Sequence, residues 1–233
     1  MKKITHLFFD LDHTLWDFDT NSRQTLLALY ATHALQERVG ADFEAFFRAF
    51  QKTTQGLWQA YNDNQIDKEG IRYARFRRVF ALLEADPDTV PVDLESQYQH
   101  LCPRQPALMP YCVETLEKLA NSGFHLHIIT NGFEKTQRTK LKYSGILPFF
   151  QTVVTSECTG FKKPAPEIFW HALQKSNCQI EEALMIGDSL DSDIKGASLI
   201  AMQSLFYNPQ RQTFILPQGA KSIHCLRQIP DNI

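Results

Sequence analysis

Three features are missing from this 233-residue chain, and each absence excludes a class of protein. No run of apolar residues reaches the roughly 18 that span a bilayer, so no membrane-spanning helix is predicted. The formal net charge of −2 provides no basic field of the kind that binds nucleic acid or an anionic membrane. The five cysteines form no CxxC pair and are odd in number, which argues against a disulfide framework and against a zinc site. We therefore expect a cytoplasmic protein that binds neither nucleic acid polymers nor membranes.

The first part of the chain contains one apolar strand followed by helical patterns only. Residues 4–9 form a short apolar run without helical period, which predicts a buried strand. Residues 17–105 then show helical spacing, clearest in four phenylalanines that follow Asp42, a residue type that caps helices. The helices expected in this part lie over residues 20–38, from 43 onward, over 67–84 and after Asp93.

The rest of the chain alternates helices with short apolar strands, which is typical of βαβ units and a parallel sheet. Strands are expected over residues 125–130, 152–155, 183–186, 201–206 and 222–226, and helices over 111–122, 134–143, 166–175 and 191–197. The predicted fold class is α/β, with a doubly wound, Rossmann-like parallel sheet. Its core comprises residues 1–16 and 106–233, and residues 17–105 form an inserted all-helical cap domain.

Polar side chains follow the predicted strands at the points where these strands end. Ligands of doubly wound sheets bind beyond the carboxyl ends of the strands, so these side chains are candidates for one site. An aspartate-rich turn is the alternative explanation for Asp10 and Asp12, which follow the first strand. Polar residues at the end of every strand favour a site. The residues are Asp10, Asp12, Thr14, Thr130, Asn131, Lys162, Lys163, Asp188, Ser189 and Asp193; Asp191 is left out because it could cap the helix that follows.

The chemistry that suits these groups is phosphoryl transfer, in which catalysis consists mostly of positioning and electrostatics. The Asp10 carboxylate is a candidate nucleophile that forms an aspartyl-phosphate. Mg²⁺ held by Asp10 and Asp188 would neutralise both nucleophile and phosphate. Asp12 is placed to protonate the leaving oxygen and later to deprotonate water. Thr130 and Asn131 offer neutral donors to phosphate oxygens, and a lysine supplies positive charge.

Four segments in order resemble the motifs of the haloacid dehalogenase-like hydrolase superfamily. They are DLDHT at 10–14, ITNG at 129–132, KP at 163–164, and GDS at 187–189 with Asp193. The helical insertion after the first motif resembles the superfamily's type 1 cap, that of subfamily I. The resemblance implies a Mg²⁺-dependent phosphatase that acts on a small phosphorylated metabolite.

The resemblance also implies a role for each matching residue. Lys163 is chosen over Lys162 because it directly precedes the proline. The implied roles are nucleophile and metal ligand for Asp10, acid/base and metal ligand through its carbonyl for Asp12, phosphate binding for Thr130 and Lys163, metal binding for Asp188, and orientation of Lys163 or a metal-bound water for Asp193.

The finer function has several alternatives. The residues FDLDHTLWDF at 9–18, ITNGF at 129–133 and Ser156-Glu157 look closest to the pyrimidine 5′-nucleotidase branch, which acts on noncanonical nucleoside monophosphates. Phosphoglycolate and sugar phosphates are the alternative substrates. A 2-haloacid dehalogenase is disfavoured because a halide leaves without a proton, so Asp12 would have no function. A non-catalytic binding module is disfavoured because buried like charges are costly to keep without a use.

Other positions have more than one interpretation. His13 stands where the superfamily usually has glycine, which puts the phosphate loop in question. Arg72, Arg75, Arg77 and Arg78 are predicted to form a solvated helix face, with contact to a phosphate or base as the alternative. His125 and His127 share one face of a strand, and we expect packing or surface roles for them. Both a monomer and a homodimer are compatible with the sequence.

Overall fold

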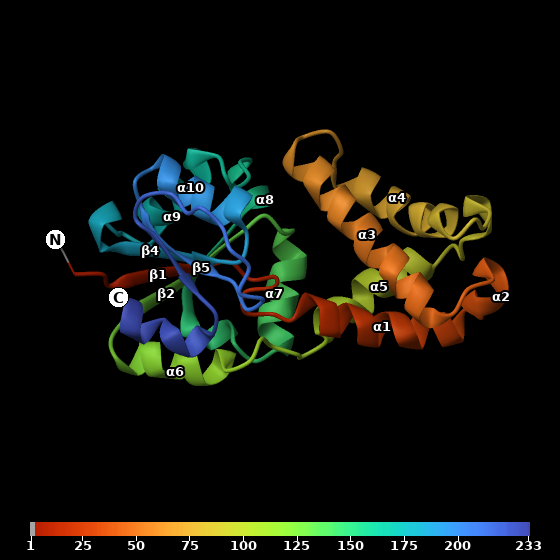
Figure 1. Cartoon of the computed structure of the whole chain (residues 1–233), viewed down its shortest axis with the longest axis horizontal. Helices are drawn as coiled ribbons and strands as arrows, with labels where there is room; N and C mark the ends of the chain where they lie inside the picture. Colours follow the sequence, from red (N-terminus) through yellow and green to blue (C-terminus); the bar gives the residue numbers. More distant parts are fainter. Residues whose placement is uncertain (1–2) are drawn as a thin grey trace. The chain divides into compact units, whose positions relative to one another are not determined.

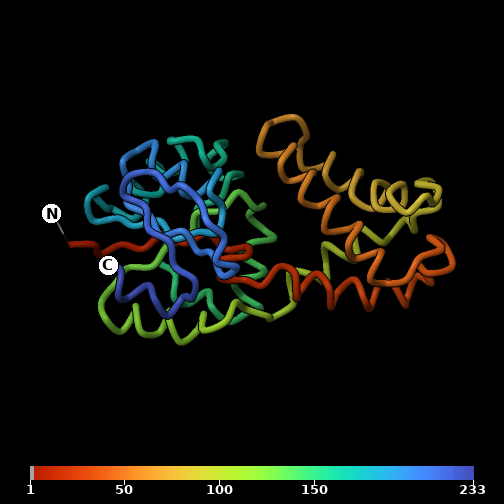
Figure 2. Tube along the Cα trace, in the orientation of Figure 1, coloured from red at the N-terminus to blue at the C-terminus, as the bar shows by residue number. Residues whose placement is uncertain are grey.

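The computed structural model describes residues 3–233, which form two compact units. The sheet unit contains the described residues up to Phe18 together with Pro106–Ile233, and the helical unit contains Asp19–Gln105. The helical unit is a single insertion in the chain, which leaves the sheet unit after Phe18 and returns at Pro106; the trace can be followed in Figure 2. In the described residues no helix is long and apolar enough to cross a membrane.

The sheet unit is built on six parallel strands in the order β3-β2-β1-β4-β5-β6. This is the doubly wound parallel sheet that the sequence predicts. Because β1 lies between β2 and β4, the strand order reverses beside it, and such a switch point is where ligands of this architecture bind. The strands are β1 (His6–Phe9), β2 (His125–Thr130), β3 (Phe150–Thr155), β4 (Ala183–Gly187), β5 (Gln203–Tyr207) and β6 (Ala220–Ile223).

Helices cover both faces of this sheet, with α9 and α10 on one side and α6 on the other (Figure 1). Phe8 of β1 and Met185 of β4 contribute to a buried core that also includes Phe169 of α9. The central strands are apolar on both faces, as expected for a covered parallel sheet. The helices of the unit are α6 (Cys112–Asn121), α7 (Glu134–Tyr143), α8 (Ser156–Thr159), α9 (Pro166–Lys175) and α10 (Lys195–Leu199), the last preceded by a π-helical turn over Leu190–Ile194.

The helical unit contains most of α1 (Phe18–Thr32), α2 (Leu35–Val39), α3 (Phe43–Asn62), α4 (Lys68–Leu82) and α5 (Leu94–Leu101). Asp42 caps α3 as predicted, since its side chain accepts a hydrogen bond of 2.8 Å from the Ala45 amide. The single helix predicted over residues 20–38 is wrong. The chain breaks at Ala34, which adopts a left-handed conformation with φ of 48°, and a separate short helix follows.

One of the four arginines predicted to be solvated is buried. Arg75 of α4 is 7% exposed, and its Nη1 atom lies 2.9 Å from Oε1 of Glu95 on α5. Its guanidinium also lies 5.1 Å from the centroid of the Tyr98 ring. The expectation of a solvated face therefore fails at Arg75, because α4 and α5 pack against each other at this position.

Candidate active site

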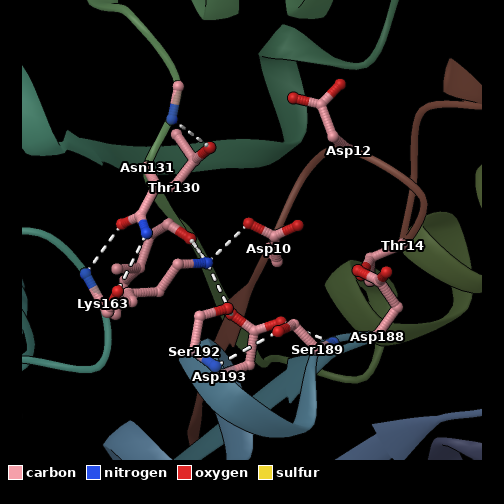
Figure 3. Close-up of polar contacts among 12 residues, drawn as sticks. Asp10, Asp12, Thr14, Thr130, Asn131, Lys163, Asp188, Ser189, Ser192 and Asp193 are labelled. Carbon is pink, nitrogen blue, oxygen red and sulfur yellow. Dashed lines mark hydrogen bonds and ion pairs between the residues drawn. The ribbon is translucent and has the colours of Figure 1, made fainter. Parts of the chain in front are cut away.

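The centre of the candidate site is Asp10, which directly follows β1 at the switch point of the sheet. Its Oδ1 atom lies 2.6 Å from Nζ of Lys163, a residue of the loop between α8 and α9. The lysine also contacts Oδ1 of Asp193 at 2.6 Å and donates to the Ile129 carbonyl at 2.8 Å (Figure 3). All three of its donor positions are thereby used.

Lys163 is almost completely enclosed, with 1% of its surface exposed. Burial alone would lower the pKa of its ammonium group, but the charges of Asp10 and Asp193 outweigh this effect and raise the pKa. The lysine therefore remains a fixed positive charge next to Asp10. The structure thus places Lys163 at the site, as expected from its position before Pro164.

Asp193 is held against this lysine by its own loop. The Ser189 amide donates to Asp193 Oδ2 at 3.1 Å. Gly187 is required for this approach, because a Cβ atom at that position would lie 2.2 Å from Asp193 Oδ2. The glycine of the GDS segment therefore makes room for the carboxylate that orients Lys163.

Asp188 lies on the opposite side of Asp10 from the lysine in Figure 3, at the end of β4. Its Oδ1 atom accepts a hydrogen bond of 2.9 Å from the Thr14 hydroxyl, and Thr14 is fully buried. One carboxylate oxygen from each of Asp10, Asp188 and Asp193 lies within 4.8 Å of the others. Three carboxylates thus share the neighbourhood of one lysine, which leaves an excess of negative charge.

The excess of negative charge shows in the protonation of the carboxyl groups. Burial, with the neighbouring Asp193 and Asp188, raises the pKa of Asp10 to about 8 despite the opposing effect of Lys163. Burial and Asp193 likewise raise the pKa of Asp188 to about 7. A divalent cation relieves this type of repulsion, and oxygen donors at this spacing suit a hard cation such as Mg²⁺. The residues therefore fit the metal that the sequence predicts.

Thr130 and Asn131 are adjacent at the end of β2, and their side chains form hydrogen bonds with different partners. Thr130 is buried, and its Oγ1 atom accepts from the Gly132 amide at 3.1 Å. The Asn131 side chain donates to the Lys163 carbonyl at 2.9 Å and accepts from the Lys163 amide at 2.7 Å. The Asn131 side chain therefore fixes the loop that carries Lys163. The contacts of Thr130 and Asn131 with phosphate stay predictions.

Asp12 is separate from the Asp10 cluster, and its carboxylate points away from Lys163 in Figure 3. Its Oδ1 atom lies 2.5 Å from Nζ of Lys140, and its Oδ2 atom accepts from Nε2 of Gln137 at 2.9 Å. Burial would raise the pKa of Asp12, but Lys140 and Gln137 outweigh it and lower the pKa. Both partners belong to α7, and neither is among the residues predicted from the sequence. A lysine on the apolar face of a short helix was the available signal, since buried lysines are rare unless paired.

His13 occupies a glycine-like conformation. Its φ of 61° is in the left-handed region, and its side chain is exposed. Histidine is among the residues enriched there, so the backbone path of a glycine is preserved without glycine. The loop from Asp10 is closed by hydrogen bonds from the His13 amide to the Trp16 carbonyl and from the Trp16 amide to the Leu11 carbonyl, both 2.9 Å.

Comparison with known proteins shows which family the chain resembles over most of its length. The model of the haloacid dehalogenase-like hydrolases matches residues 4–200. The chain is 31% identical over 205 residues to the pyrimidine 5′-nucleotidase PynA of Streptococcus pneumoniae, covering 87% of this chain and 83% of PynA. It is 38% identical over 218 residues to the glyceraldehyde 3-phosphate phosphatase of Methanothermobacter thermautotrophicus, covering 88% and 85%. The crystal structure of the HAD-hydrolase YfnB of Bacillus subtilis, solved with bound magnesium, matches with a TM-score of 0.85 at 26% identity over 99% of both chains.

One class of protein combines this fold with this order of site residues along the strands, and the family model matches the same class. This protein is a member of the haloacid dehalogenase-like hydrolase family.

Proposed function

We propose that this protein is a Mg²⁺-dependent phosphomonoesterase whose nucleophile is Asp10. The observation that carries the proposal is the position of Asp10 between a buried lysine on one side and Asp188 on the other, at the switch point of the sheet. A phosphate placed there meets a nucleophile, a fixed positive charge and a hydroxyl donor from Thr130. These are the parts that phosphoryl transfer needs.

In the first step the Asp10 carboxylate attacks phosphorus. A bond forms between an Asp10 oxygen and phosphorus, and the bond to the ester oxygen breaks. Asp12, which carries a proton in the enzyme–substrate complex although its pKa is lowered in the ligand-free protein, gives that proton to the ester oxygen. In the second step Asp12 takes a proton from water as the water oxygen attacks phosphorus. The Asp10–phosphorus bond breaks, inorganic phosphate leaves, and Asp12 is protonated again.

The other residues hold these groups in place. Lys163 counters the charge of Asp10 and of the bound phosphate, and Asp193 fixes the lysine. Asp10 and Asp188, with the Asp12 carbonyl, would hold Mg²⁺, and Thr14 orients Asp188. When bound, the cation supplies positive charge that screens the phosphate from the approaching carboxylate.

The substrate we propose is a nucleoside 5′-monophosphate, of the pyrimidine type. The motifs of the chain and the similarity to PynA over most of both chains support this choice. A small sugar phosphate is the second candidate, supported by the similarity to the glyceraldehyde 3-phosphate phosphatase. Both substrates are alkyl phosphates, so both require a proton on the leaving oxygen.

Phosphate release from a substrate panel tests the proposal. The panel contains UMP, dUMP, TMP, AMP, phosphoglycolate, glyceraldehyde 3-phosphate and hexose phosphates, with and without Mg²⁺. We expect preference for the pyrimidine monophosphates, with loss of release in Asp10→Asn and in chelator. Preference for a sugar phosphate would keep the reaction and replace the substrate. No release from any compound by the folded protein would refute the phosphatase proposal.

A further inference from the structure

Helix α7 presents two polar side chains on its buried face. Gln137 is 1% exposed and Lys140 is 5% exposed, and both lie one helical turn or less from the fully buried Leu141. A glutamine and a lysine in the place of core residues are costly unless each has a partner. Their partners show what the helix does at this position.

Lys140 and Gln137 together hold both oxygens of Asp12. Lys140 Nζ contacts Oδ1 at 2.5 Å, and Gln137 Nε2 donates to Oδ2 at 2.9 Å. The lysine is itself fixed, because its Nζ atom lies 4.5 Å from the centroid of the buried Trp16 ring. The Asp12 carboxylate is therefore held by two side chains that have little freedom of their own.

The Gln137 amide connects Asp12 to the phosphate-binding candidate Thr130. Besides Asp12, Nε2 donates to Thr130 Oγ1 at 3.1 Å, and that oxygen also accepts from the Gly132 amide at 3.1 Å. Two hydrogen bonds accepted by one hydroxyl oxygen leave its own proton for donation, which is what an anionic phosphate requires. One amide group thus orders the proton-transfer residue and the phosphate-donor residue.

Two further observations indicate that the position of the Gln137 amide is set by the two hydrogen bonds that its Nε2 atom donates. Its Oε1 atom is buried without a partner among the described residues, so the acceptor end of the group is left unsatisfied. A Cβ atom on Gly132 would lie 1.6 Å from Gln137 Nε2. The glycine of the ITNG segment is therefore needed to admit the Gln137 side chain.

We propose that Lys140 and Gln137 are positioning residues of the reaction, which rests on the proposed phosphatase function. They hold Asp12 where it exchanges a proton with the leaving oxygen, and Gln137 in addition turns the Thr130 hydroxyl toward phosphate. Neither residue touches the reacting atoms. The effect that both residues have through Asp12 depends on whether the leaving group needs a proton, whereas the effect of Gln137 through Thr130 does not.

The test compares two substrates whose leaving groups differ in this need. UMP releases an alkoxide that must be protonated, whereas p-nitrophenyl phosphate releases a stable phenolate. The value of kcat/KM reports the steps through formation of the aspartyl-phosphate. For Lys140→Met we expect kcat/KM to fall by at least about 100-fold with UMP, on the scale of general acid catalysis, and by less than about threefold with p-nitrophenyl phosphate.

The second chemical step gives an independent readout. Because Asp12 also activates water, Lys140→Met should accumulate the aspartyl-phosphate with p-nitrophenyl phosphate and show a burst of phenolate equal to the enzyme concentration. Gln137→Met should show the same selectivity together with a loss shared by both substrates, since Thr130 is also affected. Gly132→Ala should reproduce the Gln137→Met pattern, because the added Cβ displaces the amide.

Lys142→Met is the matched control, since it is the same substitution on an exposed position of α7 and should leave both substrates unchanged. Equal losses with both substrates in Lys140→Met, or full activity with UMP, would overturn the proposal. Thermal melting of each variant establishes that it is folded. If the proposed phosphatase function itself is wrong, the wild-type protein releases phosphate from neither substrate, which distinguishes this outcome from failure of the positioning proposal.

Discussion

Each unit of the chain buries a charged cluster, and the two clusters differ in their balance of charge. In the helical unit, Arg75 faces one carboxylate, Glu95, beside the Tyr98 ring. In the sheet unit, Lys163 faces two carboxylates directly, and a third, Asp188, lies close by. The first cluster is neutral as it stands, whereas the second has surplus negative charge.

This difference separates a structural ion pair from a site. A balanced pair needs nothing further, and hydrophobic residues of similar size can often replace it. A surplus of buried carboxylates persists only when something else compensates it, and a bound cation is the simplest compensation. The first three of the five predictions below test this contrast directly, and all five run from the largest expected effect to the smallest.

Asp10→Asn should change activity and stability in opposite directions, with the largest effect on activity. Loss of the nucleophile should lower kcat by at least about 10⁴-fold, the scale of losses in covalent catalysis. Removal of one surplus charge should at the same time raise the melting temperature of the metal-free protein, because burial and like charges disfavour ionised Asp10. Initial rates and thermal melting measure the two effects. A lower melting temperature would contradict the idea that the site is strained by excess charge.

Single and double replacements should distinguish the two clusters. Arg75→Met and Lys163→Met should each cost about 3–5 kcal/mol, because each leaves buried carboxylate charge unpaired. Arg75→Met with Glu95→Met should recover most of the loss, since Arg75 Nε and Glu95 Oε2 have no partner among the described residues and the pair is imperfect.

Lys163→Met with Asp193→Asn should not recover in the same way, because Asp10 and Asp188 remain. Urea unfolding midpoints without divalent cation give the comparison. Equal recovery in both double variants would show that surplus charge does not distinguish the clusters.

Mg²⁺ should stabilise the sheet unit through its surplus carboxylates. At about 100 times the dissociation constant a ligand adds about 2.7 kcal/mol, which is about 5–10 °C in melting temperature for a chain of this size. Asp188→Asn should abolish the shift, while the Arg75→Met, Glu95→Met double variant should keep it. A shift that survives Asp188→Asn would place the cation elsewhere.

His127 differs from both charged clusters, because it is a buried titratable group whose partners are neutral. Its ring lies 3.0 Å from His6 Nδ1 and 2.9 Å from Thr152 Oγ1, and burial together with His6 lowers its pKa to about 3. Below pH 6.5 the unfolded chain gains a proton at this residue that the folded chain does not. The contribution of His127 to the free energy of unfolding is therefore fully present above pH 6.5 and is lost as the pH drops toward 3.

The loss from His127 amounts to about 2 kcal/mol at pH 5, from 1.36 kcal/mol per pKa unit. The difference in unfolding free energy between wild type and His127→Gln, measured from pH 7 to pH 5, isolates this contribution from the carboxylates. A constant difference over that range would refute it.

His13→Gly should have the smallest effect. Glycine relieves the left-handed strain at φ of 61° but loses more entropy on folding, so the net gain should not exceed about 1 kcal/mol. If phosphate meets only the backbone of this loop, KM should remain unchanged. A large rise in KM would assign the imidazole a direct contact with substrate.

Local signals were sufficient for much of the fold. The bounds predicted for β2, α7 and α9 agree with the structure, because their signals are local in the sequence. Glycines flank β2 and follow α7, and a proline begins α9. The motifs likewise brought Asp10, Lys163, Asp188 and Asp193 together, since parallel strands end at one edge of the sheet.

What the sequence did not reveal depends on contacts between distant segments. Lys140 appears solvent-exposed by residue type, and only the packing of α7 against the loop after β1 shows it paired with Asp12, 128 residues earlier. The burial of Arg75 cannot be predicted from its own helix, because its partner Glu95 lies on the next helix. His127 was expected to have a packing or surface role, and its hydrogen-bonded position inside the sheet depends on the register of β2 between its neighbours.

The most direct test of the account is to trap the aspartyl-phosphate. Wild-type protein is mixed with Mg²⁺ and UMP, quenched in acid within one turnover and digested for mass spectrometry. We expect one added phosphoryl group on the peptide that contains Asp10, and none in Asp10→Asn. Rapid phosphate release with no phosphoryl group on that peptide, or with the group on another residue, would contradict the assignment of Asp10 as nucleophile.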